Sequence, residues 1–565
     1  MKPSQEIVKS KFRHMFSVSN KRKFGIILTF VLLSLSFSAG LPVQASEDAE
    51  DEHAIIPGQN SNSELEIFQN LSSSSVVPTD ELDIVHEEEA FDGYNLLVLQ
   101  RMEEETRYKE LYLVIMDMEG SVIAEKRLGA NFYLADCPAE WINATAILYG
   151  TPEGAVIWDY YRDTTVELDF RGHHEYEYNH VNDTIFTFEY EFVEIEGEEY
   201  LFDRIVEYNL TGDVVWTLDT TDFVSPTQGC PFNDTFYQRP DITHSNTVFF
   251  DEDYNVIYYN ARNLNTFYEI DHSNAEILWA VGEYGNFTLY NQSGVEREAL
   301  FYHAHAVEKI DTNRFIIFDN DYHDPEDPLT KQSRILEIAV DEDAETATVV
   351  WSWEPSIEYW SRIWGDADRL PNGNSLGVFG TRGHPYSSAS ARLVEVDEEG
   401  NIVWKIDFPQ GAGYSYGVYR IERFRFAPSI DYPDTVRFTA DDNITIDLKA
   451  CYNFKPKRHV MGTYEVYVDG NLWSSGSITY DRYWRYRGQI IKLGELAPDS
   501  YNLTLSISDE AGHNTTKAVE LIISSSSINQ FVIPVIALAC IIGILSLVVA
   551  VYKGDYFARH IDKGS

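Results

Sequence analysis

The stretch Phe301–Asp321, FYHAHAVEKIDTNRFIIFDND, shows the unit from which most of this chain is built. Two histidines open it, a turn with Asp and Asn follows, and the apolar strand Phe315–Phe318 comes next. The same layout begins at three more places: His173-His174, His244 and, with aspartate in place of histidine, Asp366. Because equivalent positions of a repeat face equivalent directions, the pattern predicts that histidines from three copies converge on one axis.

Short strands separated by turns fill residues 87–428, with almost no helical periodicity. A strand-turn-strand unit recurs in this region, and its second strand carries a tryptophan at positions 216, 279, 351 and 404. A period of about 60 residues with about four strands per unit is typical of propeller blades. The length of the region predicts five to six blades. A β-sandwich or a solenoid of hairpins is the alternative.

The composition excludes one class of partner and limits another. The formal charge of −48 over 565 residues argues against nucleic acid, whose phosphates need a basic surface. The four cysteines include no CxxC pair, so we expect no structural zinc and no other metal. If one disulfide forms, we expect Cys137–Cys230. The acidic run after Asp319 lacks the glycine and glutamate of an EF-hand and is interpreted as a solvated loop.

The two ends of the chain predict a secreted ectodomain with an anchor. Residues 1–45 have a basic start and an apolar run like a signal peptide, with an uncleaved anchor as the alternative, and 46–86 are interpreted as an acidic linker. Residues 429–525 indicate an immunoglobulin-like or fibronectin-like β-sandwich that acts as a stalk. Residues 529–552 predict one transmembrane helix, which leaves 553–565 cytoplasmic. Ten Asn-x-Ser/Thr sequons favour an extracellular glycoprotein at the cell membrane.

Four residues form a candidate catalytic set: His174, His244, Arg262 and His305. Histidine acts as a nucleophile or a general acid and base near neutral pH. The planar fork of arginine donates two hydrogen bonds at once to a sulfuryl or phosphoryl group. A single histidine in a β-repeat is more often a packing residue, but three at one repeat position favour a cationic pocket for a tetrahedral anion. His173 and His303 are close enough in sequence to exchange roles with their neighbours.

Several segments taken together resemble the arylsulfotransferases that need no phosphoadenosine donor. They are GHHEYEYNHVNDTIFTF, DITHSNTVFF, NARNLNTFYEID, YHAHAVEKI, GDADRLPNGNSLGVFG and RLVEVDEEGNIVW, in order over residues 168–408. The resemblance implies an all-β, six-bladed propeller that moves a sulfuryl group from an aryl sulfate to a phenol, without a cofactor. It also implies a transient sulfohistidine and ping-pong kinetics.

The resemblance assigns roles to residues of this chain. His305 matches the nucleophile, the histidine of D-x-x-H-x-N matches His244, and the arginine 18 positions further matches Arg262. His174, from the double-histidine motif, is expected to move a proton at the leaving or the accepting phenol. Substrate-binding positions are expected at His173, His303, Asn246 and Asp366. Ala304 departs from the polar residue that often precedes the nucleophile.

Two other functions remain open from the sequence. The first is a non-catalytic surface propeller that binds ligands or other cell-surface proteins, for which a stalk and an anchor are equally suitable. The second is a quinone-dependent dehydrogenase propeller, whose blades also repeat tryptophan. The second is ranked lower, because no vicinal cysteine pair of the kind that some of these enzymes use is present.

Overall fold

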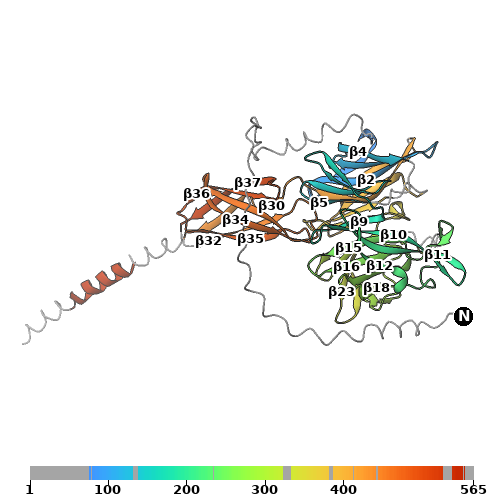
Figure 1. Ribbon diagram of the computed structural model, residues 1–565. Helices are drawn as coiled ribbons and strands as arrows, with labels where there is room; N and C mark the ends of the chain where they lie inside the picture. Colours follow the sequence, from blue (N-terminus) through green and yellow to red (C-terminus); the bar gives the residue numbers. More distant parts are fainter. Residues whose placement is uncertain are drawn as a thin grey trace, which may run out of the picture.

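The fold is all-β, as predicted, with a large ring of sheets followed by a smaller two-sheet domain (Figure 1). The computed structural model describes residues 76–77, 79–130, 138–232, 235–321, 323, 332–380, 386–411, 413–440, 443–525, 538–551 and 553. The predicted signal segment 1–45, Cys137, the acidic positions 324–331 and the tail 554–565 lie outside these ranges.

Within the described ranges, six sheets of the ring each contain a four-stranded antiparallel meander. Three of them are β29 (Tyr414–Phe424), β2 (Tyr94–Glu103), β3 (Lys109–Met116) and β4 (Val122–Ala130); β5 (Ala139–Asn143), β6 (Ala146–Gly150), β7 (Ala155–Asp159) and β8 (Thr164–Glu167); and β9 (His173–Asn179), β10 (Thr184–Ile195), β11 (Glu198–Asn209) and β12 (Val214–Asp219). The other three are β15 (Ser245–Asp251), β16 (Val256–Ala261), β17 (Thr266–Asp271) and β18 (Glu276–Gly282); β21 (His305–Asp311), β22 (Arg314–Asp319), β23 (Arg334–Asp341) and β24 (Thr346–Trp353); and β25 (Asp366–Arg369), β26 (Ser375–Phe379), β27 (Ala389–Val396) and β28 (Ile402–Pro409).

The meanders are arranged as in a β-propeller. The strands β29, β5, β9, β15, β21 and β25 contact one another in that cyclic order, so they line the centre of the ring. The ring is closed by β29, which comes from the end of this region and pairs with β2 from its start. Short strands extend two meanders and form one separate hairpin: β1 (Asp83–His86) on β28, β19 (Thr288–Tyr290) with β20 (Glu296–Arg297) on β24, and β13 (Thr235–Phe236) with β14 (Arg239–Pro240).

The predicted linker 46–86 is therefore too long at its carboxyl end. Asp83–His86 pairs antiparallel with β28, in register from Asp83 with Asp407 to His86 with Trp404. The segment is acidic and short, so its sequence shows no clear strand pattern. It forms a strand because it pairs with β28.

Burial along the strands explains the tryptophan repeat. The inner strand β15 is buried at every residue, whereas three of the six residues of the outer strand β12 are exposed. All four repeated tryptophans lie on the fourth strand of their meanders, and Trp279 and Trp404 are almost completely buried. A large aromatic side chain on the outer strand fills the space between neighbouring sheets, where it removes much apolar surface from water.

The C-terminal domain has two sheets that share one apolar core, as a β-sandwich does. One sheet contains β30 (Ser429–Asp431), β32 (Ile444–Cys451) and β35 (Arg487–Gly494). The other contains β31 (Thr435–Thr439), β37 (Asn514–Ser524), β36 (Asp499–Ser508), β33 (Val460–Val468) and β34 (Asn471–Tyr480). Burial alternates along β32, which places one face toward the core. Its immunoglobulin-like identity stays a prediction.

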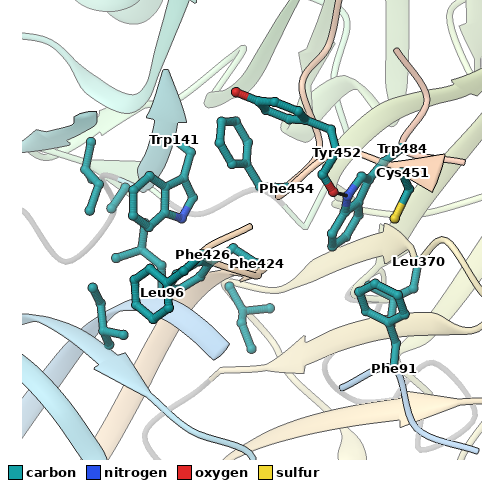
Figure 2. Packing of buried hydrophobic residues seen from close by; sticks show 14 of the residues in the cluster. Phe91, Leu96, Trp141, Leu370, Phe424, Phe426, Cys451, Tyr452, Phe454 and Trp484 are labelled. Atoms are coloured by element: carbon teal, nitrogen blue, oxygen red, sulfur yellow. Dashed lines mark hydrogen bonds between the residues drawn. The ribbon is translucent and has the colours of Figure 1, made fainter. Parts of the chain in front are cut away.

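The C-terminal domain projects from one side of the ring and packs against it at its near end, and its predicted role as a stalk stays a prediction (Figure 1). A single hydrophobic cluster contains residues of both parts. Figure 2 shows Trp141 of β5 beside Phe424 and Phe454, with ring centroids 4.6 and 5.7 Å away. Trp484 meets Phe91 edge to face at 5.4 Å. Aromatic contacts of this kind bury large apolar areas, so the two parts stabilise each other.

The remaining predictions about the ends of the chain are tested only in part. Residues 538–551 are helical with exposed side chains. In the part of the chain that the structure describes, no helix is long and apolar enough to cross a membrane. Residues 529–537 and 552 of the predicted span 529–552 lie outside that part. The described sequon asparagines are all at least partly exposed, and Cys230 carries a free thiol.

Candidate active site

The backbone takes the same unusual conformation where four successive inner strands begin. His174, His244, His303 and Trp364 have φ of 65°, 44°, 54° and 63°. A side chain other than glycine is uncommon at positive φ and costs about 1–3 kcal/mol there. Repetition at one position of four meanders shows that this geometry is built into the fold. It turns side chains from four sheets toward the end of the channel.

The predicted convergence of histidines is confirmed. His173 and His174 place their Nδ1 atoms 2.7 Å apart, and the rings of His174 and His244 lie 4.9 Å apart. The ring of Tyr419, on β29, lies 6.2 Å from His174 and 6.1 Å from His305. His305 and His303 are almost completely buried. Histidines from three sheets therefore surround one small volume.

The proton on His305 is placed by Asn320. The side-chain amide Nδ2 of Asn320 donates to the carbonyl oxygens of Ser361 and Trp364, at 2.7 and 2.8 Å. Its Oδ1 must therefore face His305, where it lies 2.7 Å from Nδ1. Since this oxygen only accepts, Nδ1 of His305 carries the hydrogen and Nε2 keeps a free lone pair. This is the tautomer that a nucleophilic imidazole needs.

Two carboxylates orient the other histidines. Asp241 places Oδ2 2.6 Å from Nδ1 of His244. Asp203 places Oδ1 3.3 Å from Nε2 of His173, a charge contact without hydrogen-bond alignment, and its Oδ2 accepts hydrogen bonds from the backbone N–H of Ser245 and the hydroxyl of Thr243. A proton held at Nε2 of His173 makes its Nδ1 the acceptor toward Nδ1 of His174. His174 then carries its hydrogen on Nδ1, and its Nε2 is a base.

Arg262 supplies the positive charge of the site. It opens the short 3-10 turn Arg262–Leu264 after β16, and only 2% of it is exposed. Its Nη1 donates to Oδ1 of Asn263 at 2.7 Å, and Nδ2 of Asn263 donates to the carbonyl of Asp241. The guanidinium is thus held in the loop that also orients His244. A fixed cation among histidines repels metal ions and attracts an anion.

Burial and charge favour the neutral form of three of the histidines, His174, His303 and His305. Burial holds the pKa of His174 and His305 well below the ordinary value of 6.5, and Arg262 lowers the pKa of both further. The pKa of His303 is lowered by burial and by Arg262 in the same way. Neutral imidazoles at physiological pH are available as nucleophile and base.

Two of the eight predicted site residues lie just beside this group. The amide of Asn246 donates to the carbonyl oxygen of Ala304, at 2.8 Å. The carboxyl of Asp366 accepts a hydrogen bond from the backbone N–H of Ile421, at 2.9 Å. Both side chains thus join inner strands of neighbouring sheets, because short polar groups there bind the adjacent backbone. Their contacts show that both side chains link neighbouring inner strands, and their substrate-binding role stays a prediction.

Sequence reasoning missed Tyr419, Arg420 and Asp203. The first two lie on β29, the strand that closes the ring, where the histidine repeat is replaced by a different sequence. Asp203 lies within β11, away from any repeated polar position. A tyrosine next to an arginine on a buried strand is a weak signal in a chain with 36 tyrosines.

Comparison with known proteins identifies the family. The profile of the family described as Arylsulfotransferase (ASST) matches residues 81–420, which include the ring of meanders except the last four residues of β29, and every histidine of the site. The chain belongs to the arylsulfotransferase family. A comparison with curated proteins gave no match.

Likenesses to solved structures are low. The extracellular domain of a protein from B. thetaiotaomicron, assigned as a hybrid two-component system, has 8% identity and a TM-score of 0.27, over 79% of this chain and 57% of its own. A Bacteroides fragilis protein assigned as a 6-phosphogluconolactonase has 11% identity and a TM-score of 0.29, over 62% and 88%. The dihydro-heme d1 dehydrogenase NirN has 10% identity and a TM-score of 0.26, over 80% of this chain and 82% of its own. At these scores the likenesses carry no argument about this chain.

Proposed function

We propose that this protein moves a sulfuryl group from an aryl sulfate to a phenol through a sulfated His305. The observation that carries the proposal is the hydrogen bond between Asn320 and Nδ1 of His305, which leaves Nε2 as a neutral nucleophile. Membership of the arylsulfotransferase family supports the same chemistry.

The first half-reaction forms the sulfohistidine. Nε2 of His305 attacks sulfur, an N–S bond forms, and the bond from sulfur to the aryl oxygen breaks with its electron pair on the phenolate. Arg262 attracts the sulfuryl oxygens and offsets the charge that develops in the transition state. An aryl oxide with a low pKa leaves as the anion and needs no proton.

The second half-reaction returns His305 to its resting state. A phenol enters, and Nε2 of His174 takes the proton of its hydroxyl while the oxygen attacks sulfur. The N–S bond breaks with its electron pair on Nε2 of His305, and the new aryl sulfate leaves. The proton on His174 then returns to solvent. His244, held by Asp241, lies beside His174 and contributes a second nitrogen to the sulfuryl pocket.

The full-length protein with 4-nitrophenyl sulfate as donor and phenol as acceptor tests this mechanism. We expect phenol-dependent release of nitrophenolate and, without phenol, a mass gain of one sulfuryl group on His305. His305→Ala should abolish both, while His86→Ala, an exposed histidine on β1, should retain both. Turnover that survives in His305→Ala would move the nucleophile to another residue. No turnover with a wide panel of aryl sulfates would favour a ligand-binding surface propeller.

We also propose that the six meanders are the blades of one propeller and that the enzyme works outside the cell. The cyclic contacts of the inner strands support six blades, which a crystal structure would test. The basic and apolar start of the chain, the charge-free run 531–551 and the exposed sequons support an anchored ectodomain. Membrane fractionation and a mobility shift after deglycosylation would test this location.

A further inference from the structure

Beyond the histidines, the channel holds a second layer that is made of carboxyl groups. Inner strands from five sheets contribute to this acid layer: Glu140 of β5, Glu175 and Glu177 of β9, Glu308 of β21, Asp368 of β25 and Glu422 of β29. Carboxylates packed this densely repel one another, and burial makes each one costly unless a cation or a hydrogen-bond donor compensates it. The propeller supplies one such cation, Arg420, which binds Glu175 at 2.6 Å.

Two further basic side chains come from the C-terminal domain. The loop Tyr452–His459, which joins β32 to β33, carries Lys455 and Lys457 into the acid layer. Lys455 pairs with Glu308 and lies 3.3 Å from Asp368, so it joins β21 to β25. Lys457 lies 2.7 Å from Glu140 and pairs with Glu177, so it joins β5 to β9. The two lysines therefore connect four of the inner strands.

A third basic side chain of the same domain meets a fifth sheet. Arg482, between β34 and β35, places Nη2 2.6 Å from Oδ1 of Asp251 at the end of β15 and also pairs with Asp253. Only 4% of its side chain is exposed. The cations are therefore distributed around the channel mouth like the acids they meet, which is electrostatic complementarity at an interface.

Contacts of Tyr452, Asn453 and Phe454, which precede the two lysines, fix the conformation of the loop. The carbonyl of Asn453 accepts a hydrogen bond from the backbone N–H of Arg425 at 2.7 Å, and Phe454 stacks on Trp141 (Figure 2). The carbonyl of Tyr452 accepts from the indole N–H of Trp484 at 2.9 Å. Lys457 itself has φ of 53°, a conformation that a lysine adopts only at a cost. Packing on both sides thus fixes a turn that presents two lysines.

The paired acids lie on the strands that carry the reactive histidines. Glu177 is three residues beyond His174 on β9, and Glu308 is three residues beyond His305 on β21. Glu177 also accepts the backbone N–H of Phe250, which joins β9 to β15. A displacement of either strand moves its histidine, and a misplacement of about 1 Å can cost about 100-fold in rate.

We propose that the loop Tyr452–His459 plugs the channel beneath the histidines and that Lys455 and Lys457 are positioning residues for His305 and His174. The C-terminal domain is then part of the catalytic unit. Substrates enter and leave only on the histidine side, so the first phenol must depart before the second arrives. The kinetic part of this inference rests on the proposed sulfuryl transfer, while the structural part stands without it.

The test compares full-length variants by hydrogen exchange and by steady-state kinetics. In Lys455→Met/Lys457→Met, four acids lose their cations, and we expect faster amide exchange in residues 173–179 and 305–311. We expect kcat to fall about 10- to 100-fold with little change in KM, because donor binding through Arg262 is retained. Lys492→Met, an exposed lysine on β35, is the matched control and should behave as wild type.

Two rescue variants separate positioning from general loss of folding. Lys457→Arg keeps the charge and should restore kcat. Lys457→Met combined with Glu140→Gln and Glu177→Gln removes both sides of the pair and should restore slow exchange in β9, because no carboxylate is left without its cation. If Lys455→Met/Lys457→Met does not fold, folding of the triple variant Lys457→Met/Glu140→Gln/Glu177→Gln still supports the proposed plug.

Two results would overturn the inference. Unchanged exchange and unchanged kcat in Lys455→Met/Lys457→Met would show that the lysines position nothing. Equal losses in Lys492→Met would show a general effect of removing charge from this domain. If the wild-type chain transfers no sulfuryl group, the proposed function fails, but faster exchange in the double variant alone would still support the plug.

Discussion

Asn320 accepts a hydrogen bond from Nδ1 of His305 across 2.7 Å, and its own amide is held by the carbonyl oxygens of Ser361 and Trp364. Asn320 directly follows β22, Ser361 and Trp364 precede β25, and His305 begins β21. The orientation of one imidazole therefore depends on two sheets. The nucleophile is positioned by the way the sheets meet, and this has direct consequences for mutants.

Replacement of Asn320 should remove the orientation of His305 and leave the donor pocket intact. We expect Asn320→Ala to lower kcat about 100-fold, because the ring loses both its preferred tautomer and its fixed position. KM for 4-nitrophenyl sulfate should change little. Single-turnover measurement of His305 sulfation checks this directly, with Asn401→Ala on the outer surface as the control. A normal sulfation rate in Asn320→Ala would refute the role of this amide.

The shape of Arg262 should matter as well as its charge. We expect Arg262→Gln to lower kcat/KM about 10²- to 10³-fold, the usual effect of removing a donor to a developing anion. Arg262→Lys should recover only part of the loss, since an ammonium group lacks the planar fork. Steady-state kinetics beside Arg162→Gln, an exposed arginine, provide the comparison. Full activity in Arg262→Gln would place the sulfuryl-binding cation elsewhere.

The acid limb of the pH–rate profile should lie below the range in which histidine usually titrates. Burial and then Arg262 lower the pKa of His305, so the nucleophile stays neutral as pH falls through 6.5. The value of kcat/KM should therefore hold between about pH 8 and 6. In Arg262→Gln the pKa of His305 rises, and the residual activity should begin to fall at higher pH. If the acid limb lies at the same pH in wild type and Arg262→Gln, a group other than His305 determines it.

The acid layer should make the fold less stable as pH rises. Burial raises the pKa of Glu422 from 4.5 to about 8, against the opposing effect of Lys457. Between these two values the unfolded chain loses this proton and the folded protein keeps it, so the free energy of unfolding falls with increasing pH. Glu422→Gln should therefore have a Tm near that of wild type at pH 4.5 and a higher one at pH 8. Calorimetry over this range measures the difference, and a constant difference would contradict the shift.

Truncation at the interface between the two parts should destabilise both of them. Phe454→Ala removes the ring that stacks on Trp141, and a buried Phe→Ala substitution costs about 3–5 kcal/mol. Because the parts share one apolar cluster, we expect the propeller and the C-terminal domain to unfold together at lower temperature in one transition. Trp473→Ala, on an exposed side chain of the C-terminal domain, is the control. An unchanged propeller transition in Phe454→Ala would show that the parts fold independently.

Much of the fold could be predicted because it depends on local periodicity. Repeated strands, turns and tryptophans indicated a β-propeller, and the predicted strand Phe315–Phe318 lies within the observed β22. Of the predicted site residues, His173, His174, His244, Arg262, His303 and His305 meet in the structure. For the histidines their shared place in the repeat was sufficient, because repeats of one fold present equivalent side chains in equivalent directions, whereas Arg262 was predicted from the chemistry of its side chain and from the family resemblance.

The sequence by itself determined the family, the all-β class and the histidines and arginine of the site, because each of these is written in short-range patterns of residue type and spacing. Only the tertiary structure decided the tautomer of His305, the contacts of Asn246 and Asp366, and the place of Lys455 and Lys457 in the channel. Each of these depends on contacts between residues far apart in the chain. The energy of a buried charge is set by the partner that packing brings to it, and no local pattern contains that partner.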